Sequence, residues 1–218
     1  MSLLDRIKIP KYSLGEEITN AILHGIGALL SIAALVLCVV FASIHGNAYA
    51  VVSSCIYGST LIILYTMSCL YHSLKINKAK KVFRIIDHCS IFLLIAGTYT
   101  PYTLVSLNGG IGWVMFSVVW CSAILGIVLN AIDLNKYKKI SMILYIAMGW
   151  VIIFTFKPLL NALEMGGIYL LLAGGIIYTI GAIFYGIGKK HKYMHSVFHF
   201  FVLAGSILHF FSILLYVI

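Results

Sequence analysis

The chain has 218 residues, of which 62% are hydrophobic and only 10% are charged, and its formal net charge is +9. Soluble globular domains are roughly 45–50% apolar and about 25% charged, so an apolar excess of this size excludes a water-soluble domain. The lysines lie in short loops between apolar runs. There they are expected to set orientation and meet anionic lipid headgroups, and we expect no nucleic acid partner.

Residues 1–18 are mostly polar, and we expect them to form a cytoplasmic N-terminal segment without a cleavable signal peptide. A spanning helix needs about 20 mostly apolar residues. The remaining chain, 19–218, is predicted to be one domain, an all-α membrane protein with a seven-transmembrane helix bundle. Helices rather than strands are expected because the apolar runs are long and do not alternate strictly. The predicted spans are 19–43, 48–73, 84–106, 111–132, 139–157, 166–187 and 194–218, of which the fifth is the shortest and ends at "FKPLL".

The basic residues are distributed unevenly between the two sides of this bundle. Of the 15 lysines and arginines, all except Lys157 lie in the N-terminal segment or in or beside the loops after the second, fourth and sixth spans. Positively charged loops stay in the cytoplasm. We therefore expect the N-terminus to be cytoplasmic and the C-terminus to be outside, opposite to G-protein-coupled receptors. The last span also contains no lysine that could carry a retinal Schiff base.

Polar side chains recur near the ends of several spans. Ionisable residues within a membrane helix are costly and usually face the bundle interior. Glu17, Asn20 and His24 open the first span at spacings of three and four residues, which places them on one helical face. Ser68 and His72 close the second span with the same four-residue spacing.

Two further groups lie at the same predicted depth. Asp87 and His88 begin the third span, and His195 and His199 begin the seventh. With the predicted topology, all of these residues fall in a layer on the order of 10 Å deep at the cytoplasmic surface. Residues far apart in the sequence therefore converge on one level of the bundle.

Histidines at this spacing suit a zinc site, because a helix presents residues i and i+4 to a single ion. We propose His72, His195 and His199 as zinc ligands, which leaves the fourth tetrahedral position for water, as in catalytic sites. Asp87 would hold that water and accept its proton, and Ser68 would orient the water or a reacting oxygen.

The residues alone leave an alternative open. The same side chains could form a hydrogen-bonded polar cluster that locks the helices together. Glu17, Asn20 and His24 would then serve helix packing, whereas beside a metal they would support its ligands. His88 points about 100° away from Asp87 and is not proposed as a ligand, and His209 is interpreted as a packing or pathway residue.

Four segments carry a family resemblance: "EEITNAILHGIG", "SCLYHS", "RIIDHCSIFLLIAGTYTPY" and "MHSVFHFFVLAGSILH". Together they resemble the hemolysin III branch of the progestin and adiponectin receptor (PAQR) family, from about Glu16 to His209. The resemblance implies seven helices, a cytoplasmic N-terminus, a zinc ion bound by three histidines and an aspartate reached through water. The receptor members are thought to hydrolyse ceramide-like amides, and related alkaline ceramidases use a similar site. The matching positions are Glu17, Asn20, His24, Ser68, His72, Asp87, His195 and His199.

These observations favour a zinc-dependent hydrolase of a lipid amide or ester. The resemblance to bacterial members of the family implies a role in membrane-lipid homeostasis. Membrane lipids are the expected partners, with a substrate entering from the inner leaflet, and no protein partner is indicated. Two alternatives are a non-enzymatic membrane sensor with structural zinc and a pore-forming hemolysin. The expected location is the plasma membrane of a bacterial cell, with several spans.

Overall fold

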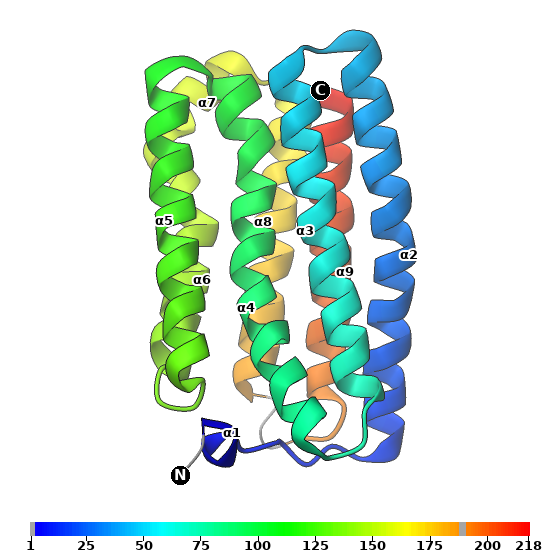
Figure 1. The fold of residues 1–218 in the computed structure, drawn as a ribbon. Helices are drawn as coiled ribbons and strands as arrows, with labels where there is room; N and C mark the ends of the chain where they lie inside the picture. Colours follow the sequence, from blue (N-terminus) through cyan, green and yellow to red (C-terminus); the bar gives the residue numbers. More distant parts are fainter. Residues whose placement is uncertain (1–2, 188–190) are drawn as a thin grey trace.

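The computed structural model describes residues 3–187 and 191–218, and this part of the chain consists of helices joined by short turns. Seven of its helical segments are long and apolar enough to cross a membrane. They stand side by side in one bundle, with the chain ends at opposite ends of it (Figure 1). The predicted all-α seven-helix architecture is therefore confirmed.

The described elements follow the predicted spans closely, with two irregular turns added. In chain order they are α1 (Leu3–Arg6), α2 (Leu14–His45), α3 (Ala48–Ser73), α4 (Lys78–Pro101), η1 (Tyr102–Leu107), α5 (Gly109–Asp133), α6 (Lys138–Trp150), η2 (Val151–Thr155), α7 (Phe156–Ala162), α8 (Met165–Ile187) and α9 (Met194–Tyr216).

The first, third and fifth spans differ from prediction in extent. Helix α4 begins at Lys78 rather than at residue 84, because the Asn77 side chain caps it by accepting from the Lys80 N–H at 2.8 Å. Helix α2 begins at Leu14 because Ser13 caps it: the Glu16 N–H donates to Ser13 Oγ, and the Glu16 carboxylate accepts from the Ser13 N–H at 2.8 Å. The fifth span continues to Ala162 and contains a tight 3-10 turn, η2. Pro158 follows this turn and cannot donate the N–H that would continue a regular helix.

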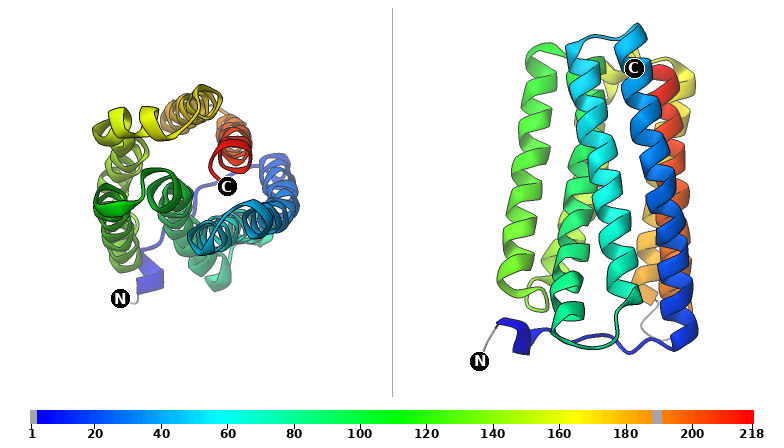
Figure 2. Two further views of the ribbon diagram at one scale, coloured as in Figure 1. Left: turned by 90° about the horizontal axis from the view of Figure 1, so that it is seen from above. Right: turned by 45° about the vertical axis from the view of Figure 1, so that its right-hand side comes forward.

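The helices form a ring in which the first and last spans are neighbours. Viewed from above, α9 lies beside α2, and α3 lies on the other side of α2 (Figure 2). Gly27 allows α2 and α3 to approach closely, because a Cβ at this position would lie 2.4 Å from Cδ1 of Tyr65. The start of α2, the end of α3 and the start of α9 therefore meet at the end of the bundle that carries the N-terminus, called the N-terminal end below.

The N-terminal segment runs across this end of the bundle (Figure 1). Lys81 Nζ donates to the Leu4 carbonyl at 2.8 Å, and the Arg84 guanidinium donates to the Lys8 carbonyl. Ile7 is buried within the same contact. The segment is thus packed against α4, and it carries Tyr12 to the base of the interior.

Candidate metal centre

Three histidines from two helices converge at the N-terminal end of the bundle. His72 lies in the last turn of α3, and His195 and His199 lie in the first two turns of α9. One ring nitrogen of each lies within 4.8 Å of the others, so the three could hold a metal ion. The Glu16 carboxylate accepts from the Tyr193 N–H at 2.8 Å, which ties the start of α9 to the start of α2.

The ring nitrogens are oriented as metal ligation requires. A carboxylate only accepts hydrogen bonds, so the contact of 2.7 Å between His72 Nδ1 and Glu17 Oε2 means that Nδ1 carries the proton. His72 Nε2 is then left with a free lone pair, and it is buried without a hydrogen-bond partner among the described residues. His195 Nε2 and His199 Nε2 lie 3.0 Å apart. This is close to the roughly 3.3 Å between two nitrogens that each lie about 2.0–2.1 Å from a tetrahedral zinc.

Glu17 links His72 to a buried lysine. Lys80 Nζ donates to Glu17 Oε1 at 2.6 Å and to the Leu74 carbonyl at 2.9 Å. Lys80 is only 1% exposed, so its charge depends on this carboxylate for compensation. The contacts from Lys80 to Glu17 and from Glu17 to His72 fix the orientation of the His72 ring and its tautomer. Carboxylates have the same effect on metal-bound histidines in other proteins.

Asn20 and His24 also lie against the histidine cluster, and both are buried. Asn20 Nδ2 lies 3.4 Å from His72 Nδ1. The His24 ring meets the His199 ring edge-on, with centroids 3.8 Å apart, and lies within hydrogen-bond distance of its Nδ1. His24 thus contacts one proposed ligand from behind and is outside the group of three that could share an ion.

Asp87 and Ser68 line one cavity together with His195 and His199. Asp87 Oδ2 lies 3.5 Å from His88 Nδ1. The Ser68 hydroxyl faces Asp87 but has no hydrogen bond of standard geometry with a described residue. The site therefore combines three nitrogen ligands with a carboxylate that can accept a proton and a hydroxyl that can donate to an oxygen.

Two tyrosines that sequence reasoning did not assign to the site contact His195. The Tyr12 ring stacks on it, with centroids 4.9 Å apart and planes inclined by 8°, and the Tyr185 ring lies 5.8 Å away. Burial raises the pKa of the Tyr12 phenol above its ordinary value, so it stays neutral. In the sequence, Tyr12 is only an aromatic residue near the start of a span, a position that an interfacial aromatic residue would occupy equally well.

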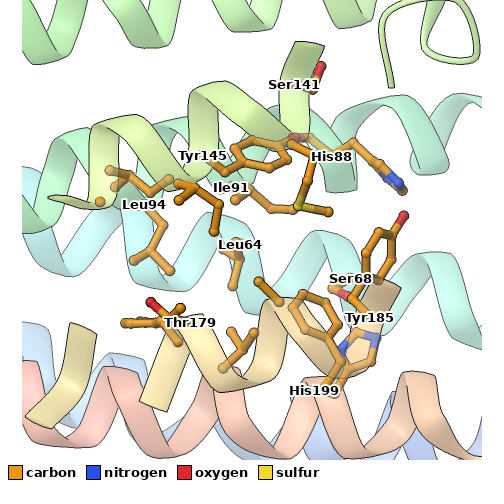
Figure 3. A pocket seen from close by; sticks show the side chains of 18 of the residues that line it. Leu64, Ser68, His88, Ile91, Leu94, Ser141, Tyr145, Thr179, Tyr185 and His199 are labelled. Atoms are coloured by element: carbon orange, nitrogen blue, oxygen red, sulfur yellow. The ribbon is translucent and has the colours of Figure 1, made fainter. Parts of the chain in front are cut away.

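The cavity has a volume of about 170 Å³ and extends from the metal centre into the bundle. Figure 3 shows Ser68, Tyr185 and His199 at one end of it, and Ile91, Leu94 and Thr179 farther along. Its wall is predominantly apolar and comes from α3, α4, α6, α8 and α9. Tyr99, Trp150 and His209 are also among the lining residues. His209, which is interpreted from the sequence as a packing or pathway residue, therefore borders this cavity. Its Nε2 lies 3.0 Å from the Leu171 carbonyl oxygen.

The described chain has seven helices that are long and apolar enough to span a membrane, and a three-histidine cluster lies at one end of them. These features place it in the class of multi-pass membrane proteins that have a candidate metal centre between their helices. Within that class, the chain belongs to the haemolysin III family, because residues 12–210 match the family model described as Haemolysin-III related. The family resemblance seen in the sequence is therefore confirmed.

Similar proteins are found in bacteria and in animals. The chain is 48% identical over 203 residues to Hemolysin-3 of Bacillus cereus, covering 93% of this chain and 92% of the relative. It is 44% identical over 205 residues to the Hemolysin-3 homolog of Bacillus subtilis (strain 168), covering 94% and 96%. The human Monocyte to macrophage differentiation factor is 25% identical over 208 residues, covering 91% and 83%.

Proposed function

We propose that the protein is an intramembrane zinc-dependent hydrolase of a lipid amide or ester, acting in membrane-lipid homeostasis. The observation that carries the proposal is the convergence of three histidine nitrogens beside Asp87 and Ser68, at one end of an apolar cavity. Two relatives come from Bacillus species, and this supports the plasma membrane of a bacterial cell as the location. The asymmetry of basic residues supports a cytoplasmic N-terminal end.

The donor set fits zinc better than a harder cation, because three neutral imidazoles suit Zn²⁺ and leave one tetrahedral position open. When bound, the ion supplies Lewis-acid polarisation of a carbonyl and lowers the pKa of water. The Glu17 carboxylate, 2.7 Å from His72 Nδ1, keeps Nε2 of that histidine available as a ligand. Three nitrogen ligands and an open position are typical of catalytic zinc rather than structural zinc.

Asp87 and Ser68 perform the proton and hydrogen-bond steps. The Asp87 carboxylate takes one proton from the attacking water, whose oxygen adds to the lipid carbonyl carbon. Ser68 donates a hydrogen bond to a reacting oxygen. The C–N bond of an amide or the C–O bond of an ester then breaks, and Asp87 returns the proton to the departing amine or alcohol. The products are a carboxylic acid and the amine or alcohol that carries the rest of the lipid.

The apolar cavity supports a lipid substrate. Leu64, Ile91, Leu94 and Val202 contribute side chains that an acyl chain can contact without losing hydrogen bonds. With the N-terminal end in the cytoplasm, the reacting carbonyl lies near the inner leaflet, from which the lipid enters.

The test is zinc content and lipid turnover measured on the same purified samples. Wild-type protein is expected to contain one zinc per chain by elemental analysis and to release fatty acid from a broad mixture of lipid amides and esters. His72→Ala is expected to lose both zinc and turnover, whereas Asp87→Asn keeps zinc and loses turnover. Zinc-loaded wild type that hydrolyses none of these lipids would contradict the proposal.

The name of the Bacillus cereus relative, Hemolysin-3, favours a pore-forming protein as a second candidate. Dye release from liposomes separates the two candidates. A pore releases dye without consuming lipid, and a hydrolase consumes lipid in a zinc-dependent way, so His195→Ala stops turnover.

A third candidate is a sensor with structural zinc, for which Asp87→Ala would keep zinc but change partner binding.

A further inference from the structure

The cavity beside the metal centre contains one strongly basic side chain. Lys138, the first residue of α6, is the one lysine or arginine among its lining residues in the described part of the chain, and Asp87 is the one carboxylate. The rest of the wall is largely apolar. A lone ammonium group in such a wall is a strong local determinant of what the cavity accepts.

Lys138 is not paired with an acidic side chain in the part of the chain that the structure describes. Among the described residues no carboxylate forms an ion pair with it, whereas Glu17 pairs with Lys80 and Asp87 lies next to His88. Lys138 is only partly exposed, so its charge is less well solvated than that of its exposed neighbour Lys139. A partly buried cation without a counter-ion favours a bound anion, because the two charges compensate each other in a medium of low dielectric.

The position of this cation relative to the histidines is set by Tyr185. Lys138 Nζ lies over the Tyr185 ring, 5.2 Å from its centroid, and the same ring lies 5.8 Å from the His195 ring. One aromatic ring therefore separates the ammonium group from a proposed zinc ligand. Figure 3 shows Tyr185 at the end of the cavity where Ser68 and His199 lie.

We propose that Lys138 binds the phosphate of an acyl lipid and thereby selects phosphate-bearing lipids over neutral ones. This inference rests on the proposed function, because it takes the scissile carbonyl of the lipid to lie at the candidate metal centre. In a glycerophospholipid, an acyl carbonyl and the phosphate are only a few covalent bonds apart. With the carbonyl at the metal centre, the phosphate reaches Lys138 and the acyl chain extends along Ile91 and Leu94.

The apolar wall distinguishes a lipid phosphate from free inorganic phosphate. Both anions share the chemistry that Lys138 recognises. Only the lipid also carries an acyl chain that can pack against apolar lining residues of the cavity such as Leu64 and Ile95.

The experiment measures binding apart from turnover. Zinc-loaded protein in detergent is titrated with phosphatidic acid and with diacylglycerol of the same acyl chains, and lipid retention is followed by native mass spectrometry. Lys138→Met keeps a side chain of similar length without the charge. It is expected to weaken phosphatidic acid binding on the order of tenfold, as for loss of a hydrogen bond to a charged group, and to leave diacylglycerol binding unchanged.

Two further variants control for structural effects. Lys139→Met removes a charge from the adjacent, exposed position and is expected to bind both lipids like wild type. Lys138→Arg retains a cation and is expected to retain the preference for phosphatidic acid. Loss of the preference in Lys139→Met to the same extent, or equal binding of both lipids by wild type, overturns the proposal.

The outcomes also separate this inference from the hydrolase itself. If the phosphate preference depends on Lys138 but no lipid is cleaved, the binding site stands and the proposed function fails. If lipid is cleaved and Lys138→Met cleaves phosphate-bearing and neutral lipids as wild type does, the function stands and the inference fails. Inorganic phosphate that displaces phosphatidic acid at equal concentration would overturn the lipid headgroup as the ligand.

Discussion

The ion pair between buried Lys80 and partly buried Glu17 gives a quantitative test of the candidate metal centre. The two charges are 2.6 Å apart, and their side chains are 2% and 16% exposed. Unit charges about 4 Å apart at an effective dielectric near 20 interact by about 4 kcal/mol, so removing one partner leaves a substantial uncompensated charge. Because Glu17 also holds His72 Nδ1 at 2.7 Å, that disturbance is transmitted directly to a proposed ligand.

We expect Glu17→Gln and Lys80→Met each to lower zinc affinity roughly 10–100-fold, which is the usual cost of losing a group that orients a metal ligand. The double variant removes both charges, and the amide oxygen that replaces the Glu17 carboxylate can still accept from His72 Nδ1–H. Its loss of affinity should therefore be smaller than the product of the two single losses, with a coupling free energy of about 1 kcal/mol or more.

Competition with a coloured zinc chelator measures these affinities on purified protein in detergent. The thermal midpoint of the metal-free protein serves as a control for folding. Single losses that simply multiply in the double variant, or wild-type affinity in both single variants, would show that the pair does not act through His72.

Three other predictions concern the metal and its surroundings. Removing zinc with a chelator should lower the thermal midpoint of wild type but not of His199→Ala, because an ion that binds only the folded state stabilises it. Tyr12→Ala removes the ring that stacks on His195 with centroids 4.9 Å apart, and it should speed zinc loss to a water-soluble chelator in stopped-flow measurements. Tyr12→Phe keeps the ring and should lose zinc at the wild-type rate. This should hold at any pH up to about 10, because the raised pKa of the Tyr12 phenol keeps the wild-type side chain neutral there. Gly27→Ala should cost about 1–3 kcal/mol in detergent unfolding because its Cβ would lie 2.4 Å from the Tyr65 ring. Gly186→Ala should be nearly neutral, because no atom of a described residue outside its own stretch of helix lies within 4 Å of the added Cβ.

The fold could be predicted from the sequence because a bilayer demands long apolar helices and little else. The extents of the spans were less predictable, since they depend on local chemistry. The capping box of Ser13 and Glu16 extends α2 into polar sequence, and a 3-10 turn lets the fifth span continue past Pro158 to Ala162. Hydrophobicity averaged over a span does not register either effect.

The three proposed ligands could be found because their signal is local. The spacing of His195 and His199 defines one helical face, and His72 closes a helix at the same predicted depth. Lys80 carries no comparable signal, because it is one of several basic residues in a short loop and its partner Glu17 is 63 residues away in the sequence. Tyr185 was missed for the same reason, since only the packing of α8 against α9 brings it to His195.

The environment of the metal centre is asymmetric, and this bears on what it can bind. On the side of the N-terminal segment, Tyr12 covers His195 and Lys80 is buried in hydrogen bonds to Glu17 and Leu74. On the other side, the same histidines open into an apolar cavity of about 170 Å³. A small polar substrate would leave that cavity wall uncovered and gain nothing from it. An amphiphile gains both from apolar contact and from the polar groups at one end. The arrangement therefore supports the proposal that the site's ligand is a molecule that the membrane itself supplies.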